Sequence, residues 1–168
     1  NPIVQFILQP ILIFGVLFHF VMGFVLELKN SKSRGVKYAN YKGGTNASWM
    51  SRNMIYSGIV ILSFLGLHFY DFWVPEMNYK YVEVLPLNPD RYFEELVHKF
   101  ESPVRVGIYA LSFVFLSLHL LHGFASSFQS VGINNKYSKA LKSFTTAFSL
   151  VVPLGFVFIA LFHHLTSF

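Results

Sequence analysis

Two stretches of the chain repeat one arrangement of residues that could hold a cofactor. In residues 18–24 (FHFVMGF) and residues 118–124 (LHLLHGF), a histidine is followed four positions later by glycine and then by phenylalanine. Residues four apart lie on one face of a helix. A histidine in an apolar helix is costly to bury and is therefore a candidate functional residue, and the glycine leaves room for a broad, flat group. We interpret the two faces as a clamp for a haem, formed by His19, Gly23, His119 and Gly123.

The composition is that of a membrane protein. Hydrophobic residues make up 54% of the chain and charged residues 12%, and the mean hydropathy is +0.49, which is typical of the membrane class. The absence of cysteine excludes disulfides, thiolate-bound clusters and cysteine-ligated zinc. The net charge of +5 would suit nucleic-acid binding, but the basic residues gather in two short loops between apolar segments. We therefore expect no nucleic-acid partner.

Four apolar segments must position the histidines. They cover approximately residues 3–28, 53–73, 103–128 and 144–168. Each contains the roughly 20 residues that a bilayer crossing requires. The sequence therefore predicts an all-α integral membrane helix bundle, with residues 1–168 forming a single transmembrane haem-binding domain.

The charges of the loops predict the orientation of the spans. The loops that follow the first and third spans contain basic residues and no acidic ones, whereas the loop between the second and third spans is rich in Asp and Glu. The positive-inside rule places the two basic loops in the cytoplasm and the acidic loop outside. Within the acidic loop, residues 91–100 are expected to form a short amphipathic helix on the outer surface.

This orientation converts sequence positions into depths. At 1.5 Å per residue, His19 and His119 each lie roughly 13 Å from the cytoplasmic ends of their spans. Two imidazoles at one level, on two helices, suit a haem with histidine on both sides of the iron. His68 lies roughly 22 Å from the cytoplasmic end of its span and cannot share that haem. The alternative is an interhelical hydrogen bond of the histidines, with both glycines merely permitting close helix packing.

Other polar residues near these levels have two interpretations each. His122 lies one turn from His119 and could bond a haem propionate or a backbone carbonyl. Ser51 and Arg52 begin the second span and could hold propionates, or could simply anchor the span at the cytoplasmic interface. The residues that close the second span near His68 are candidates for an outer quinone site or for plain interface anchoring, namely Tyr70, Asp71, Trp73 and Glu76.

Four pieces of the sequence carry a family resemblance: residues 17–19 with Gly23, Leu67 with His68, His119 with Gly123 and Phe124, and residues 127–132 (SFQSVG). Together they resemble the cytochrome b membrane-anchor subunit of succinate dehydrogenase and quinol:fumarate reductase, of the type with one anchor subunit and two haems. That family has five spans. The present chain looks like the second to fifth, and the first span of the family, with its own ligand histidine, is not among them.

The resemblance implies two haems b. It assigns His19 and His119 to the iron of the proximal haem, and His68 to the distal haem, whose other ligand would come from the family's first span. It also implies an iron–sulfur subunit and a flavoprotein subunit on the cytoplasmic face of a bacterial inner membrane, and electron exchange with menaquinone. The subunit would catalyse nothing alone, since succinate oxidation or fumarate reduction would occur in its partners.

Two alternatives belong to other classes of protein. One is a haem b anchor of another quinone-linked oxidoreductase, such as a molybdenum enzyme or a hydrogenase. The other is a haem-free transporter or channel whose histidines bind metal or relay protons, and it predicts a colourless protein.

Overall fold

The computed structural model describes residues 2–33, 52–86, 88–133 and 135–166. These ranges are almost entirely helical and contain no strand, which confirms the all-α prediction. Four helical segments are long and apolar enough to cross a membrane, as expected for a multi-pass membrane protein: Val4–Lys32, Met54–Val82, Pro103–Ser130 and Ser138–Thr166. The chain divides into two compact units, Asn1–Gly58 and Ile59–Phe168, and each is described by itself.

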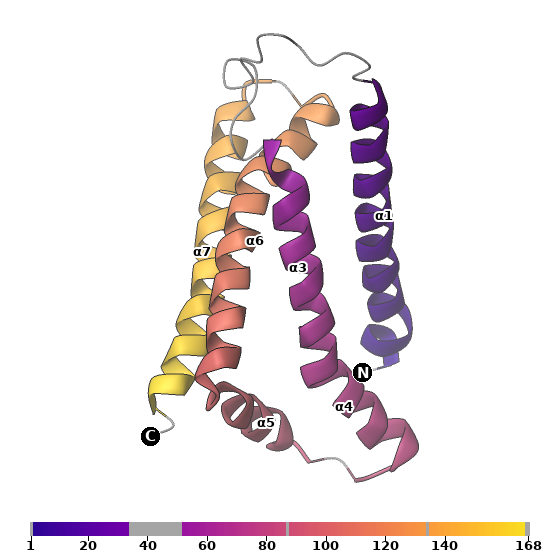
Figure 1. The fold of residues 1–168 in the computed structure, drawn as a ribbon, viewed down its shortest axis with the longest axis vertical. Coiled ribbons are helices and arrows are strands. Elements are labelled where there is room, and N and C mark those ends of the chain that lie inside the picture. The colour runs from indigo at the N-terminus through magenta and orange to yellow at the C-terminus, as the bar shows by residue number, and fades with distance from the viewer. Residues whose placement is uncertain (1, 34–51, 87, 134, 167–168) are drawn as a thin grey trace. The chain divides into compact units, whose positions relative to one another are not determined.

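The first unit contains the first membrane-length segment. A π-helical turn, η1 (Val4–Leu8), leads into α1 (Gln9–Ser33), which is drawn in indigo in Figure 1. The helix is apolar along most of its length and meets charged residues only at Glu27, Lys29 and Lys32. It therefore extends about one turn further than the expected end near residue 28, because charged side chains can remain helical where they reach the head groups.

The second membrane-length segment is longer than the sequence suggested. α3 (Met54–His68) is followed without interruption by η3 (Phe69–Trp73), α4 (Val74–Met77) and η4 (Asn78–Val82). Pro75 lies in the first turn of α4, directly after the π-helical turn η3, and the chain stays helical through it. The ion pair between Glu76 and Lys80, one turn apart, supports the polar end of the helix. The helix therefore continues to Val82, beyond the expected end of the span near residue 73.

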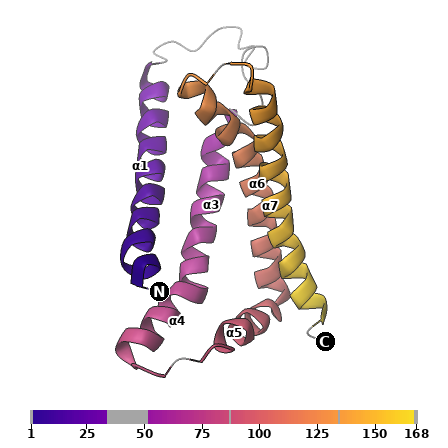
Figure 2. The same cartoon turned by 180° about the vertical axis from the view of Figure 1, so that it is seen from behind.

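In the second unit, α6 (Pro103–Ser130) and α7 (Ser138–Thr166) lie side by side along their length (Figures 1 and 2). Both helices carry small side chains that are buried, and such side chains let two helix backbones approach closely in a membrane: Ser112, Ser117, Thr145, Ser149 and Ala160. α7 begins at Ser138, about two turns before the expected start at residue 144.

One hydrogen bond between α6 and α7 replaces a bond that the sequence removes. Pro153 lies inside α7 and has no N–H, so the carbonyl of Ser149, four residues earlier, loses its helical donor. The hydroxyl of Ser117 on α6 donates to this carbonyl at 2.8 Å. Both serines are buried, and the bond therefore satisfies an acceptor that water cannot reach.

Replacing Ser117 by alanine is expected to lower the free energy of unfolding by about 1–2 kcal/mol, because it leaves the Ser149 carbonyl buried without a donor. Ser112→Ala is the matched control, since the buried Ser112 hydroxyl donates only to the carbonyl of Ile108 in its own helix. Unfolding in mixed detergent micelles, followed by circular dichroism, measures both variants. Equal losses in the two variants would contradict the assignment.

The short helix α5 (Arg91–Phe100) has the bounds that the sequence predicted. It contacts the ends of both α6 and α7, as Figure 2 shows. Phe100 and Leu96 join the hydrophobic core around Phe64, Tyr109 and Phe113, and Nδ1 of His164 lies 2.9 Å from the Phe100 carbonyl oxygen. The apolar face of α5 therefore packs on the helix pair.

Candidate functional site

The residues predicted to hold the first haem are divided between the two units. His19 and Gly23 lie on α1 and are exposed, and a Cβ added to Gly23 would meet no atom within 4 Å. Arg52 is exposed, and Ser51 falls outside the described residues.

The second half of the predicted clamp lies on α6 in the second unit. His119, His122 and Gly123 are all half-buried there. The next residue, Phe124, packs edge-on against Phe148 of α7, with ring centroids 5.4 Å apart. Phe124 lies five residues after His119, about 140° further round the helix, so this contact joins α6 to α7 on a different face from His119.

The observed helix ends leave the equal-depth prediction unchanged. His19 lies about 20 Å along its helix from Lys32, where the first membrane-length segment ends. His119 lies about 17 Å along α6 from Ser130, where the third segment ends. Both values exceed the expected 13 Å because both helices continue beyond their expected ends. The pairing of the two imidazoles on one iron stays a prediction.

His68, at the end of α3, lies among aromatic rings. The ring centroids of Phe64, Phe72 and Tyr109 are 5.7, 5.2 and 6.4 Å from that of the imidazole. Its Nδ1 is buried and makes no hydrogen bond with any described residue. A buried ring nitrogen without a partner costs free energy, and so fits a side chain whose imidazole interacts with a group outside the described residues.

The contact between His68 and Tyr109 fixes the level of His68 on α6. His119 lies ten residues further along the same helix, which corresponds to about 15 Å. Imidazoles separated in this way cannot ligate one iron. The second unit therefore carries histidines at two distinct levels.

A buried carboxylate lies one turn beyond His68. Asp71, in η3, is fully buried, and its Oδ2 accepts a hydrogen bond from the Tyr109 hydroxyl at 3.0 Å. Nε of Arg105 also lies 3.0 Å from Oδ2, and Nζ of Lys99 lies 3.8 Å from Oδ1. One carboxylate therefore connects three segments, η3, α5 and α6. We call these four residues the Asp71 cluster.

The four residues proposed for a quinone site or interface anchoring do not act as one group. Tyr70 and Trp73 are exposed, as interface anchors are, whereas Asp71 belongs to the buried cluster. Glu76 instead pairs with Lys80 and Arg91. The second span thus contributes one carboxylate to α6 and one to α5.

Arg91 is held in place from several sides. Its guanidinium bonds Glu76 and Glu95 and lies over the ring of Tyr79, 4.1 Å from the centroid. Burial opposes the charged form, but the hydrogen bond to Glu95 and the charges of both carboxylates outweigh it and raise the pKa of Arg91 above its ordinary value. The guanidinium therefore stays charged and joins α4 to the start of α5.

Sequence reasoning missed the partners of Asp71. A signal for one of them was present, because Arg105 is the one charged residue between positions 103 and 130, and a cation within an apolar helix needs a partner. Tyr109 lies one turn further on the same face. The identity of the carboxylate could not be read from spacing, since Asp71 lies on another helix.

The described residues contain no group of three or more His, Asp or Glu side chains that could hold a metal ion. A haem iron needs only one or two imidazoles from the protein, so this finding does not bear on a haem. Comparison of the chain with protein-family models, curated proteins and solved structures gives no match.

Proposed function

We propose that this chain is the haem b membrane-anchor subunit of a succinate dehydrogenase or quinol:fumarate reductase. In this role it transfers electrons between a cytoplasmic flavoprotein–iron–sulfur pair and menaquinone in a bacterial inner membrane. The observation that carries the proposal is the two levels of histidine in one membrane-length helix bundle, at His68 and His119. The glycine one turn after His119 recurs after His19, and the resemblance stated above rests on the same residues.

The haem, when bound, supplies a one-electron carrier. His19 and His119 would ligate the iron of the proximal haem, and Gly23 and Gly123 would leave room for the flat ring. The haem propionates would lie at the cytoplasmic side and be bound there by His122, Arg52 and Ser51. His68 would ligate the distal haem together with a histidine from outside this chain.

The chain's own contribution is to hold and insulate these groups. The half-buried imidazoles of His68 and His119 are restricted in orientation, and the apolar shell around them keeps the local dielectric low, which together tune a redox potential. Two levels about 15 Å apart along α6 divide the crossing of a core about 30 Å thick into shorter steps. Electrons would pass from the cytoplasmic partner to the His119 level and then to the His68 level.

The test is a reduced-minus-oxidised absorption spectrum of the purified protein, with haem counted per polypeptide and co-purified subunits identified. We expect a low-spin b-type spectrum and co-purification of a flavoprotein and an iron–sulfur protein. A colourless protein would contradict the proposal. A haem protein that co-purifies with a molybdenum enzyme or a hydrogenase would keep the haem and reject the succinate or fumarate assignment.

A further inference from the structure

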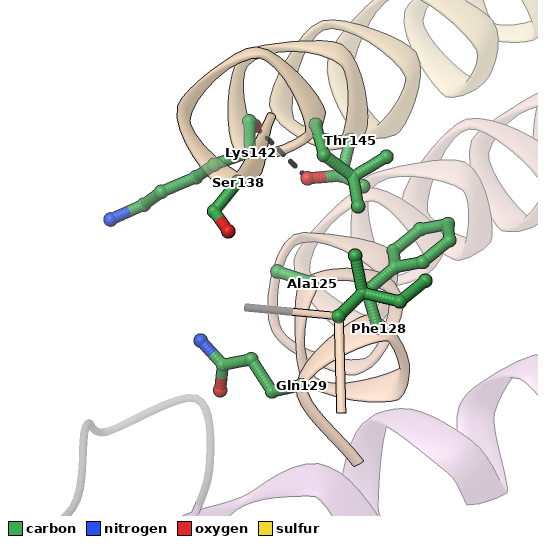
Figure 3. A pocket seen from close by; sticks show the side chains of 8 residues that line it. Ala125, Phe128, Gln129, Ser138, Lys142 and Thr145 are labelled. Carbon is green, nitrogen blue, oxygen red and sulfur yellow. Dashed lines mark hydrogen bonds between the residues drawn. The ribbon is translucent and has the colours of Figure 1, made fainter. Parts of the chain in front are cut away.

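A cavity of about 370 Å³ lies between the end of α6 and the start of α7, inside the second unit (Figure 3). Phe128 and Gln129 line it from α6, Ile133 from the connection between the helices, and Ser138, Leu141 and Lys142 from α7. None of the residues assigned to a haem lines this cavity. It therefore requires an explanation apart from the proposed electron transfer.

The lining has a polar side and an apolar side. In Figure 3 the side chains of Gln129, Ser138 and Lys142 lie on one side and the ring of Phe128 lies on the other. The oxygen of the Ser138 hydroxyl accepts a hydrogen bond from the Asn135 N–H at 2.8 Å, so the hydroxyl proton can still be donated. A fitting ligand accepts hydrogen bonds at one end and is apolar at the other.

The charge around the cavity indicates an anion. Lys136, Lys139 and Lys142 lie near it in sequence, and residues 102–168 contain no Asp or Glu. All acidic residues of the second unit lie between Asp71 and Glu101, near the opposite end of α6, which is roughly 40 Å long. No carboxylate of this unit can neutralise these lysines.

We propose that the cavity binds the phosphate head group of an anionic phospholipid. Lys142, Gln129 and Ser138 bind the phosphate, and Phe128, Ile133 and Leu141 contact the glycerol and the first carbons of the acyl chains. The cavity lies at the ends of two membrane-length helices, where lipid head groups are found, and basic pockets between such helices suit anionic lipids. The apolar side of the lining favours a lipid over a free anion.

The experiment compares lipid retention by the full chain and two charge-matched variants. Purified protein is exchanged into detergent with phosphatidylglycerol or phosphatidylcholine, and bound lipid is counted by native mass spectrometry. We expect the parent protein to retain one phosphatidylglycerol in preference to phosphatidylcholine. Lys142→Glu should weaken this binding roughly tenfold or more. Lys139→Glu makes the same charge change on a residue that does not line the cavity and should have much less effect.

If Lys142→Glu fails to fold, Gln129→Leu tests the same site without changing the charge of the protein. We expect Gln129→Leu to weaken the retention of phosphatidylglycerol as well. Equal effects of the two lysine variants would overturn the proposal, since they would indicate general surface attraction. Displacement of the lipid by inorganic phosphate alone would instead identify a free-anion site. Unchanged lipid binding in Lys142→Glu, with loss of a co-purifying protein, would assign the cavity to an acidic partner segment and also reject the proposal. Each of these measurements can be made whether or not the protein contains haem.

Discussion

Replacing His119 by alanine is expected to remove the b-type absorbance that the intact chain supplies by itself, and replacing His19 is expected to do the same. In the proposed site each imidazole occupies one side of the iron, so loss of either leaves the haem with a single protein ligand. The expected result is a loss of most of the haem counted per polypeptide, together with loss of the low-spin spectrum. Reduced-minus-oxidised spectroscopy and haem extraction measure both quantities.

Two further histidines serve as controls for this prediction. His68 lies about 15 Å along α6 from the level of His119, so His68→Ala should leave the His19–His119 haem in place. His98 lies on α5 and its side chain is 79% exposed, so His98→Ala should change nothing in the spectrum. If His19→Ala and His119→Ala both retain full haem content, the clamp assignment is wrong. If His68→Ala removes the same haem, the separation into two levels is wrong.

The second large effect is expected at the Asp71 cluster. Arg105→Ala leaves a carboxylate that is 0% exposed with the Tyr109 hydroxyl and the more distant Lys99 as its partners. Breaking a buried ion pair on one side typically costs 3–5 kcal/mol. Because Lys99 remains within 3.8 Å, we expect a loss near the lower end, about 3 kcal/mol of unfolding free energy.

Removing the charge of Asp71 should cost less unfolding free energy than removing the charge of Arg105. In Asp71→Asn the amide oxygen can still accept from Tyr109, while the side chains of Arg105 and Lys99, 29% and 26% exposed, can turn toward water. We expect a loss of about 1–2 kcal/mol. The double variant Asp71→Asn with Arg105→Ala should be more stable than Arg105→Ala alone, because no buried charge is left unpaired.

Unfolding in mixed detergent micelles measures this cycle, with haem content recorded on the same samples. A double variant as unstable as the sum of the two single changes would show that Asp71 and Arg105 do not interact. Loss of haem in step with stability would indicate a purely structural role for the cluster. A stable Asp71→Asn protein with an altered haem spectrum would instead indicate that the carboxylate acts on the His68 level.

Local patterns were sufficient for much of the fold. Hydropathy gave the four membrane-length helices and an amphipathic pattern gave the bounds of α5 at residues 91–100, because apolar runs and helical periodicity are properties of neighbouring residues. The ends of the spans were less accurate. The helix that contains the second span continues to Val82, and the Glu76–Lys80 pair supports its polar end.

The histidine levels were also accessible from the sequence, because helical rise converts a count of residues into a distance. Counting separated His68 from His119, and the contact of His68 with Tyr109 supports that separation in the second unit. Whether His19 and His119 ligate one iron is the prediction that the spectra will test.

Three features depended on tertiary structure. The Asp71–Arg105 ion pair, the Ser117–Ser149 hydrogen bond and the cavity beside Lys142 each join residues from different helices. The sequence by itself determined which segments are helical and how far along each helix a side chain lies. Only packing decided which faces meet, and that choice depends on small side chains such as Ser149 and Ala160 fitting between helices. Such complementarity links residues tens of positions apart, so no local pattern encodes it.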